Sequence, residues 1–247
     1  MIEIETSGAV QRIRLNRPDK KNALTGEMYA ALAEALEQPA DGVRVHLLCG
    51  VPGAFTAGND IGDFLAMAEG GMQNTPVVRF LHALARCEMP IVAAVDGLAI
   101  GIGTTLLFHC DMVFASPRSL FRTPFLDLGL VPEAGASLLA PRTMGHARAF
   151  ELLCFGEPFD AARAQAAGFV NHIVTEDELE ARALAAASAI AAKPVEAMRL
   201  SRGLLWGDRT ELRSRMDEEI RLFSERLASD EAKAAFTAFM DRSRKSR

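Results

Sequence analysis

Residues 91–106, IVAAVDGLAIGIGTTL, contain the two signals that decide the fold. The first five residues are all apolar and do not alternate with polar ones, which is typical of a strand covered on both faces, as in a parallel α/β sheet. Glycines follow at positions 97, 101 and 103, so the chain can turn tightly and open a helix directly afterwards. The stretch predicts an α/β core in which a buried strand leads to a glycine-rich turn and a helix.

The surrounding sequence repeats this pattern of strands and helices. Alternation on both sides of Ser7-Gly8 predicts a hairpin that ends before Pro18. Thr25 is placed to cap a helix in which Met28, Leu32 and Leu36 form an apolar stripe. The remaining predicted elements of the core, alternately strand and helix, are the stretches 43–50, 77–87, 91–97, 104–108 and 111–116.

From about Pro132 onward the pattern becomes almost wholly helical. The stretch after Glu178 is rich in Ala, Leu, Glu and Arg and contains few helix breakers. We therefore predict a domain boundary near residue 190. Residues 1–190 would form the α/β core with the functional site, and residues 191–247 a helical C-terminal subdomain.

The composition is that of a globular protein. Of the 247 residues, 49% are hydrophobic and 24% are charged, with a formal net charge of -5. An acidic balance argues against non-specific binding to nucleic acid as the main role. The four cysteines are scattered without metal-ligand spacing, which favours reduced thiols in a cytoplasmic protein. No secretory signal pattern opens the sequence, and the longest apolar run is far too short to span a bilayer, so we expect no membrane partner.

A second glycine-containing turn has the same design as the first. Residues 55–64, FTAGNDIGDF, follow an apolar strand and lead into a helix, whose N-terminus carries a positive partial charge. Two such loops can each supply one backbone N–H to a single oxygen and so form an oxyanion hole. On spacing alone, ordinary strand-to-helix turns are the better explanation. The G-x-G at 101–103 is not a dinucleotide fingerprint, because the third glycine and the acidic ribose partner are missing.

Four segments resemble, in order, the motifs of the enoyl-CoA hydratase/isomerase (crotonase) superfamily. They are residues 15–29, LNRPDKKNALTGEMY; residues 55–61, FTAGNDI; residues 93–116, AAVDGLAIGIGTTLLFHCDMVFAS; and residues 168–174, GFVNHIV. The resemblance covers nearly the whole chain and implies a spiral of repeated ββα units with the helical subdomain at its C-terminus.

The same resemblance implies an acyl-CoA substrate and a place in fatty acid metabolism. It also implies a homotrimer or homohexamer, with oligomerisation assigned to residues 191–247. It implies neither a metal nor a catalytic cofactor, because coenzyme A enters as part of the substrate.

In this superfamily two backbone N–H groups hold the thioester oxygen, and the resemblance places them at Asn59 and Ile102. Their side chains are incidental to that role. The hydratases use two glutamates, whose positions fall here at Thr105 and Phe125. Neither residue can act as a carboxylate, so hydration by two glutamates is not expected.

Glu133 is the base that the resemblance implies. It lies in residues 124–135, PFLDLGLVPEAG, a stretch similar to that of the peroxisomal-type Δ3,Δ2-enoyl-CoA isomerases and of the ring-opening phenylacetyl-CoA-pathway isomerases. There a single acidic residue moves the proton. We expect Glu133 at the start of a helix, where the dipole alone would also favour a glutamate. The chain departs from that branch in having Ala134 before Gly135, and Asp127 is a rival base in the same segment.

The resemblance thus predicts that a 3-enoyl-CoA is converted to a 2-enoyl-CoA through a dienolate. Two alternatives remain open. One is another single-base reaction on a CoA thioester, such as ring isomerisation or C–C cleavage. The other is a non-catalytic crotonase-fold protein that binds or scaffolds.

The CoA groove is expected to be lined by lysines beside the first motif and by backbone of the two neighbouring segments. The residues assigned to it are Lys20, Lys21, Asn22, Ala23, Leu24, Ala57, Gly58, Asn59, Asp60 and Ile61. Candidates for the acyl pocket are Phe64, Leu65 and Phe125.

The remaining polar residues near these motifs are expected to serve the structure. Asp60 would bond to its own loop, as Asp does in turns. His109 and Asp111 lie at the far end of the second helix and would satisfy local hydrogen bonds. Asp63 and Glu69 are not expected to take part in the chemistry. The basic tail 241–247 would be a solvated terminus, although in relatives such residues reach CoA phosphates.

Overall fold

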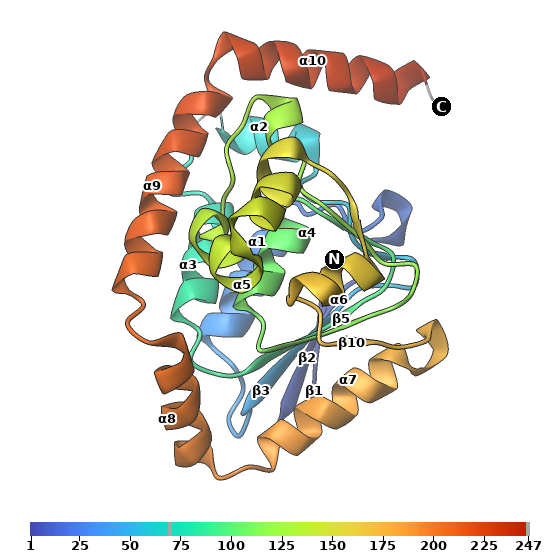
Figure 1. Ribbon diagram of the computed structural model, residues 1–247, viewed down its shortest axis with the longest axis vertical. Coiled ribbons are helices and arrows are strands. Elements are labelled where there is room, and N and C mark those ends of the chain that lie inside the picture. Colours follow the sequence, from blue (N-terminus) through green and yellow to red (C-terminus); the bar gives the residue numbers. More distant parts are fainter. Residues whose placement is uncertain (69–70, 246–247) are drawn as a thin grey trace.

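The computed structural model describes residues 1–68 and 71–245, with side chains described for all of these except 66–68 and 242–245. Glu69 and the side chains of the basic tail from residue 242 onward lie outside the described residues, so the predictions for them stay untested. In Figure 1, α7 lies below the strands, and α1, α3, α4 and α5 lie above them.

Strands in the described part of the chain form two sheets. The six-stranded sheet has the order β1-β2-β3-β5-β7-β10, and the four-stranded sheet the order β4-β6-β8-β9. Neighbours are parallel except for β1 with β2 and β8 with β9. The strands are β1 (Ile2–Ser7), β2 (Val10–Leu15), β3 (Val45–Cys49), β4 (Ala54–Thr56), β5 (Ile91–Val95), β6 (Leu98–Ile100), β7 (Met112–Ala115), β8 (Leu120–Arg122), β9 (Phe159–Asp160) and β10 (His172–Ile173).

The helices follow the strand pairs and then make up the C-terminal part of the chain. They are α1 (Gly26–Glu37), α2 (Ile61–Ala68), α3 (Pro76–Arg86), α4 (Ile102–Thr105), α5 (Ala136–Phe150), α6 (Ala161–Ala167), α7 (Glu176–Ala191), α8 (Val195–Trp206), α9 (Thr210–Leu227) and α10 (Asp230–Lys245). Short helical turns are η1 (Pro18–Lys20), η2 (Leu106–His109), η3 (Leu126–Leu128) and the π-helical turn η4 (Glu151–Phe155).

The core is a repeat of two strands followed by a helix. The pairs β3–β4, β5–β6 and β7–β8 each send their first strand into the six-stranded sheet and their second into the four-stranded sheet. The predicted buried strand at 91–95 is confirmed, since every residue of β5 is buried and β5 lies parallel to both β3 and β7. A strand with sheet neighbours on both edges and helices on both faces has no solvent-facing side, which explains its unbroken apolar sequence.

The two faces of the six-stranded sheet are covered by different helices. Small residues of α7 spaced four apart (Ala183, Ala187 and Ala191) pack on β3 and β5, together with Leu179. The opposite face carries the larger core, which includes buried residues of α1 and α3. Helix α7 can lie close to the sheet because the alanine side chains between them are small.

The N-terminal predictions are also confirmed. Residues 2–7 pair with 10–15 as an antiparallel hairpin. The hydroxyl of Thr25 accepts a hydrogen bond from the Met28 N–H at 3.4 Å, and Met28, Leu32 and Leu36 are buried along one side of α1. The helix expected at 104–108 is longer, because α4 and η2 together cover 102–109.

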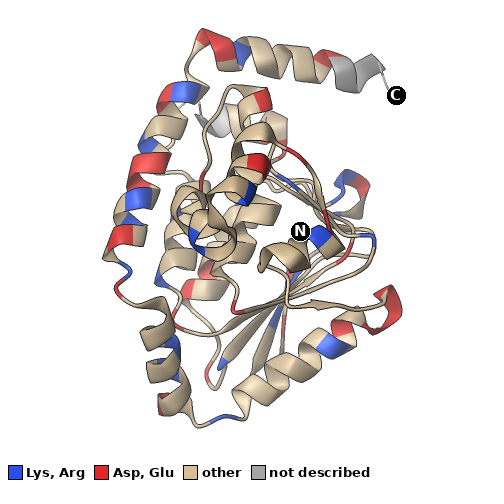
Figure 2. Cartoon of the chain, in the orientation of Figure 1, with Lys and Arg blue, Asp and Glu red and all other residues tan. Residues whose placement is uncertain are grey.

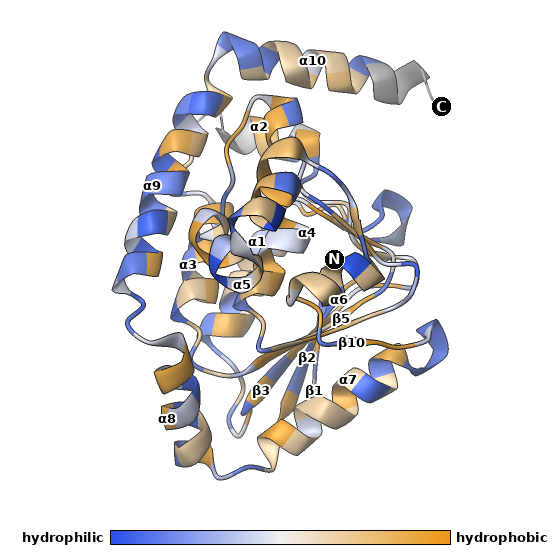
Figure 3. Ribbon diagram, in the orientation of Figure 1, coloured by the Kyte–Doolittle hydropathy of each residue, from blue (hydrophilic) through white to orange (hydrophobic). Residues whose placement is uncertain are grey.

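Helices α8 to α10 extend along the side and the top of the core in Figure 1. Helix α9 packs against α3 and α5, and Figure 3 shows hydrophobic residues on it only at intervals between hydrophilic ones. The proposed division at residue 190 stays a prediction. No helix in the described residues is long and apolar enough to cross a membrane. The four cysteines are free.

Candidate active site

The two glycine-containing loops meet where β4 and β6 end. The sequence suggested that each loop directly follows a long buried strand, but a second short strand intervenes: β4 precedes Gly58, and β6 precedes Gly101. Strands β4 and β6 are parallel neighbours, and the carboxyl ends of parallel strands share one edge of a sheet. The loops therefore lie side by side at the edge of the four-stranded sheet, away from the six-stranded one.

Two glycines allow this close approach. Gly58 has a φ of +88°, and a Cβ placed there would lie 2.9 Å from the Ile100 carbonyl oxygen on the neighbouring loop. A Cβ on Gly103 would lie 2.4 Å from the Thr56 methyl group. Any side chain at either position would push the loops apart. The glycines that the sequence singled out are thus required by contact between the loops as well as by turn geometry.

The Asn59 N–H is left free by the way its neighbours pair. Leu24 N donates to the Gly58 oxygen at 2.8 Å, and Asp60 N donates to the Leu24 oxygen at 2.9 Å. In a parallel bridge of this kind, the residue between the two bonded neighbours turns its own N–H to the opposite side. Ile102 begins α4, so its N–H has no partner inside the helix. Among the described residues neither N–H has a backbone acceptor.

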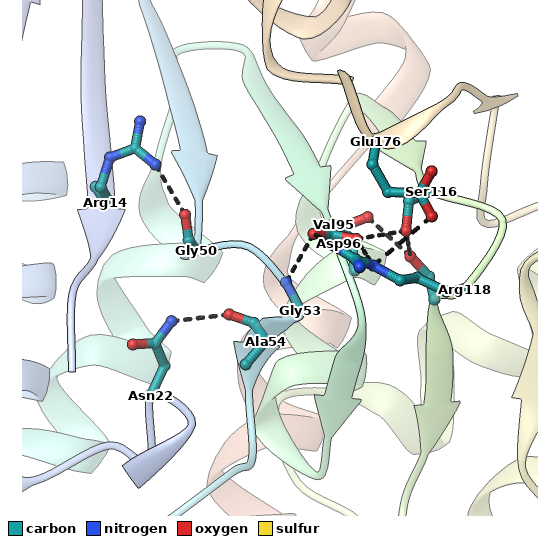
Figure 4. Close-up of polar contacts among 11 residues, drawn as sticks. Arg14, Asn22, Gly50, Gly53, Ala54, Val95, Asp96, Ser116, Arg118 and Glu176 are labelled. Atoms are coloured by element: carbon teal, nitrogen blue, oxygen red, sulfur yellow. Dashed lines mark hydrogen bonds and ion pairs between the residues drawn. The ribbon is translucent and has the colours of Figure 1, made fainter. Parts of the chain in front are cut away.

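Side chains hold the backbone just ahead of both loops (Figure 4). Asn22 is fully buried and donates to the Ala54 oxygen at 2.8 Å. Asp96 accepts from the Gly53 N–H at 2.7 Å and also binds Arg118. Burial alone would raise the pKa of Asp96, but the hydrogen bonds outweigh it and lower the pKa to about 2. Asp96 therefore stays ionised and ties the strand before one loop to the turn before the other.

A cavity of about 710 Å³ opens in front of these loops. Gly58, Asn59 and Ile102 line it on one side, and Glu133 lines it as well. Aromatic residues supply much of the remaining wall, namely Phe64, Phe125, Phe223, Phe236 and Phe239. A site with two free N–H donors, one carboxyl group and apolar walls suits a ligand that has a polar carbonyl on an apolar chain.

Glu133 is a buried carboxyl group whose side chain meets that of Thr105. Glu133 is 8% exposed, and one of its oxygens accepts a hydrogen bond from the Thr105 hydroxyl at 2.5 Å. Burial raises the pKa of Glu133 to about 8, although the Thr105 bond lowers it, and the negative charge of Glu219 raises it further. A carboxyl group with a pKa near neutrality can both take and return a proton.

The helix expected at Glu133 begins three residues later, at Ala136. Ala134 and Gly135 intervene, both with left-handed backbone at φ +61° and +69°. Ala134 therefore adopts a conformation that favours glycine, despite its Cβ. The His109 imidazole lies 2.7 Å from the Ala134 oxygen, and because burial lowers the pKa of His109 to about 4, the neutral ring donates to that oxygen. This contact gives His109 a structural role, but the partner lies 25 residues away and is not the local one expected.

Glu133→Gln is expected to raise the free energy of unfolding at neutral and alkaline pH. An unfolded glutamate ionises near pH 4.5, whereas folded Glu133 keeps its proton up to about pH 8. Between these values the wild type loses stability as the pH rises, by about 1.4 kcal/mol per pH unit, and Gln escapes this loss. Urea unfolding at about pH 4, 6 and 8 should give a difference between the proteins that grows with pH. A difference that is the same at every pH would contradict the raised pKa.

The other acidic residues have structural partners. Asp60 accepts from the Asp63 N–H at 3.4 Å, as predicted, but its main partner is Arg17 at 2.8 Å. Asp63 accepts from the Gly26 N–H at 2.6 Å. Asp111 accepts from the Ile91 N–H and pairs with the buried Arg202. Each carboxylate fastens one segment of chain to another.

Asp127, the rival base, lines the outer part of the cavity. Its side chain is 54% exposed and paired with Arg122 at 2.8 Å. Asp127 is therefore solvated and paired, whereas Glu133 is buried in the wall of the cavity. Glu133 fits the role of base better than Asp127 does.

Of the ten residues assigned to a CoA groove, four line the cavity and six do not. Ala57, Gly58, Asn59 and Ile61 line the cavity, whereas the other six, Lys20 to Leu24 and Asp60, do not. Asn22 uses its side chain to hold the turn before β4, and Leu24 is fully buried. Binding of CoA at these positions stays a prediction. Of the acyl-pocket candidates, Phe64 and Phe125 line the cavity, while Leu65 packs against the core.

Several residues that the sequence did not assign complete the site. Thr105 was considered only as a missing glutamate, yet it binds Glu133. The Tyr29 hydroxyl donates to the Asn59 side-chain oxygen, so the Asn59 side chain also holds its loop. Phe236 and Phe239 come from α10, and their spacing of three residues was the available signal. The described residues hold no group of three His, Cys, Asp or Glu side chains that could ligate a metal.

The chain has the crotonase fold: two sheets built from repeated ββα units, with two glycine loops that offer N–H groups to one cavity. Solved structures of enoyl-CoA hydratase/isomerases match this chain over nearly its full length. The chain belongs to the enoyl-CoA hydratase/isomerase family, whose sequence profile matches residues 5–246.

Named relatives include both isomerases and hydratases. The chain is 34% identical over 249 residues to enoyl-CoA delta isomerase 2 of Rattus norvegicus, covering 98% of this chain and 63% of that protein. It is 35% identical over 193 residues to 1,2-epoxyphenylacetyl-CoA isomerase of Escherichia coli, covering 75% of this chain and 74% of the relative. An enoyl-CoA hydratase/isomerase structure from Pseudoalteromonas atlantica superimposes with a TM-score of 0.92 at 41% identity, covering 98% and 97% of the two chains.

Proposed function

We propose that this protein moves the double bond of a 3-enoyl-CoA to the 2-position. The observation that carries the proposal is the buried carboxyl group of Glu133, which lines the same cavity as Asn59 and Ile102. The positions at which hydratases resembling this chain carry glutamates hold Thr105 and Phe125 instead. One proton-transfer group and an oxyanion site are sufficient for isomerisation, since no water has to be activated.

The reaction would proceed in two proton transfers. The Glu133 carboxylate takes a proton from C2 of the substrate, and the electrons of that C–H bond move into the C1–C2 bond while the thioester oxygen becomes negative. The Asn59 and Ile102 N–H groups stabilise this oxygen. The resulting dienolate then takes the same proton back from Glu133 at C4, so that the double bond lies between C2 and C3. Atoms and charge are balanced within substrate and Glu133.

The walls of the cavity support an acyl substrate. Phe64, Phe125 and Phe236 would surround the apolar chain, and exclusion of water strengthens both hydrogen bonds to the oxygen. The CoA moiety would leave the cavity toward Ala57 and the first motif, with Lys20 and Lys21 near its phosphates. Coenzyme A is here part of the substrate.

Two other proposals concern the assembly and the location of the protein. Exposed leucines on α8, Leu204 and Leu205, are 85% and 89% exposed. Apolar surface of this kind supports association of the C-terminal helices into a homotrimer or homohexamer. A cytoplasmic location stays a prediction.

A second candidate function uses the same groups. The relative named 1,2-epoxyphenylacetyl-CoA isomerase favours a single-base ring isomerisation of a CoA thioester. A cavity lined by five phenylalanines is compatible with an aromatic acyl group. The non-catalytic alternative would require that Glu133 only stabilises the loop.

Purified protein offered a 3-enoyl-CoA and, separately, a 2-enoyl-CoA distinguishes these possibilities. Isomerisation leaves the mass of the thioester unchanged, whereas hydration adds one water, so mass spectrometry with NMR of the products identifies each reaction. We expect turnover of the 3-enoyl-CoA and no rapid hydration of the 2-enoyl-CoA. Rapid hydration would overturn the proposal. Binding of neither thioester would favour the non-catalytic alternative.

The kcat/KM for 3-enoyl-CoA is expected to rise with pH and level off near the pKa of Glu133. The base acts only when ionised, and burial raises the pKa of Glu133 to about 8. Because kcat/KM reports the free enzyme, it should increase about tenfold per pH unit below that value. Initial rates at low substrate concentration from about pH 6 to 9 measure this. A flat profile over that range would exclude Glu133 as a base with a raised pKa.

A further inference from the structure

Glu219 is a buried charged residue that has no part in the proton transfers proposed above. It lies on α9 and is 4% exposed. The other buried residues of α9 are all apolar, including Met216 and Ile220 on either side of it. Figure 2 shows that charged residues otherwise mark much of the length of α9, and most of these are exposed. A carboxylate on the buried face of a helix is costly unless it is hydrogen-bonded, so its partners indicate what it does.

All the partners of Glu219 lie directly after the proposed base. One carboxylate oxygen accepts from the Gly135 N–H at 2.6 Å, and the other from the Ser137 N–H at 3.0 Å and from the Ser137 hydroxyl. Helix α5 starts at Ala136, and its N-cap residue is Gly135, which has no side chain to accept from the first N–H groups. Glu219 therefore supplies the acceptors for the free N–H groups at this helix start, where the dipole also favours negative charge.

The segment from Glu133 to Ser137 is thereby held from two sides. His109 holds the Ala134 oxygen from η2, and Glu219 holds the next N–H groups from α9. The left-handed backbone of Ala134 and Gly135 between these contacts sets the direction in which Glu133 projects. Backbone of this kind is strained for Ala and persists when surrounding contacts determine it.

We propose that Glu219 is a positioning residue for Glu133. From α9 it fixes the Gly135–Ser137 backbone, so that the Glu133 carboxyl group points to the substrate. This inference rests on the function proposed above, since it assigns Glu133 a proton to move.

The charged and titratable groups around the pair are few. Glu219 lies one turn from Arg215 on α9. Burial raises the pKa of Glu219, and its hydrogen bonds and the charge of Arg215 lower it. Glu133 faces the Thr105 hydroxyl from α4, Tyr29 from α1 and Glu219 from α9. Tyr29 and His109 are both neutral at pH 7. Among these groups Glu219 is the one whose negative charge raises the pKa of Glu133.

Glu219→Gln keeps the size of the side chain while it removes the charge and one acceptor. We expect kcat to fall about 10- to 100-fold, because small misplacement of a reacting group has effects of that size, while KM stays within about threefold. The acidic limb of the kcat/KM profile should move to lower pH, since Glu133 loses a negative neighbour. A merely structural residue would reduce the amount of folded protein without changing the pH profile of the folded enzyme.

Glu218→Gln is the matched control. It removes the same charge one residue earlier on α9, but the Glu218 side chain is 55% exposed and is paired with Arg215 at 3.3 Å. We expect wild-type kcat and pH profile. Glu219→Asp is the conservative variant: it keeps the charge but has a shorter reach, so it should lower kcat and leave the acidic limb in place. If Glu219→Gln does not fold, Glu219→Asp tests the proposal by itself. A lower kcat with an unchanged acidic limb supports the positioning role, and a wild-type kcat contradicts it.

A titration without turnover separates this inference from the proposed function. In protein with ¹³C-labelled glutamate carboxyl groups, the Glu133 signal is the one absent from Glu133→Gln. Its apparent pKa should fall in Glu219→Gln and be unchanged in Glu218→Gln. If the wild type does not isomerise but this shift occurs, the proposed function fails and the positioning role stands. If the wild type isomerises while Glu219→Gln changes neither the titration nor kcat, the positioning role is overturned.

Discussion

Glu133→Gln is expected to lower kcat/KM for a 3-enoyl-CoA by about a thousandfold or more. Gln has nearly the same size and can still accept the hydrogen bond from Thr105, so the loop around it should keep its shape. It cannot take the proton from C2, which removes the base from both halves of the reaction. Both kcat and kcat/KM should fall together, while KM changes little, because the thioester oxygen is still held by Asn59 and Ile102. Stopped-flow or steady-state assays on the purified variant measure this.

Asp127→Asn is the matched control for that experiment. Asp127 lines the same cavity and is the rival carboxylate, but it is exposed and paired with Arg122. We expect kcat within about threefold of the wild type, since exposed ion pairs contribute little. If Asp127→Asn were the inactive variant and Glu133→Gln retained activity, the assignment of the base would be wrong.

Gly58→Ala is expected to lower kcat/KM by about 10²- to 10³-fold and to destabilise the fold by about 2 kcal/mol. The residue has a φ of +88°, and its new Cβ would lie 2.9 Å from the Ile100 oxygen. Relief of that contact has to separate the two loops, so the Asn59 and Ile102 N–H groups no longer converge on one oxygen. The size of the activity loss follows from removing one donor of an oxyanion hole. Enzyme assays together with urea unfolding separate the two effects.

Gly62→Ala provides the comparison for Gly58→Ala. Gly62 lies in the same loop region, in the first turn of α2, and the nearest atom to a Cβ there is an Asp60 oxygen at 3.7 Å. Alanine is favoured over glycine inside a helix, so stability should stay equal or rise slightly. Full activity in a folded Gly58→Ala protein would show that contact between the loops is not needed for the oxyanion site.

The buried base has opposite consequences for stability and for catalysis. A carboxyl group that is ionised only above about pH 8 destabilises the folded protein at physiological pH, yet the same burial makes its carboxylate a strong base. Two helices hold the segment that carries it: Thr105 of α4 donates to Glu133, and Glu219 of α9 accepts from the Gly135 N–H. The C-terminal helices thus support the site as well as cover it, because Glu219 on α9 holds the loop and Phe236 and Phe239 on α10 line the cavity.

Much of the core was predictable because its signals are local. The unbroken apolar run at 91–95 indicates a strand covered on both faces, and the Thr25 cap with its apolar stripe indicates α1. Glycines at turns mark the two loops that approach each other. The family motifs add the identity of the loops, since backbone N–H groups depend on turn geometry that the sequence specifies over a few residues.

The start of α5 was predicted three residues too early, for a reason that no local pattern reveals. Glu133 precedes two residues with left-handed backbone, and one of them is Ala134, which would be expected to continue a helix. Contacts from η2 and α9 stabilise that conformation against its local preference.

The surroundings of the base could not be read along the chain. Thr105 and Glu133 are 28 residues apart, and Gly135 and Glu219 are 84 residues apart. Each of these side chains is ordinary in its own segment, and its role exists only when folding brings the segments together. The pKa of Glu133 follows in the same way, since it is raised by burial among distant residues and not by its neighbours in sequence. Local periodicity and turn chemistry therefore determined most strands of the six-stranded sheet and several helices, and family motifs marked the two N–H loops. Long-range packing determined the short strands of the second sheet, how the base is aimed and when it ionises.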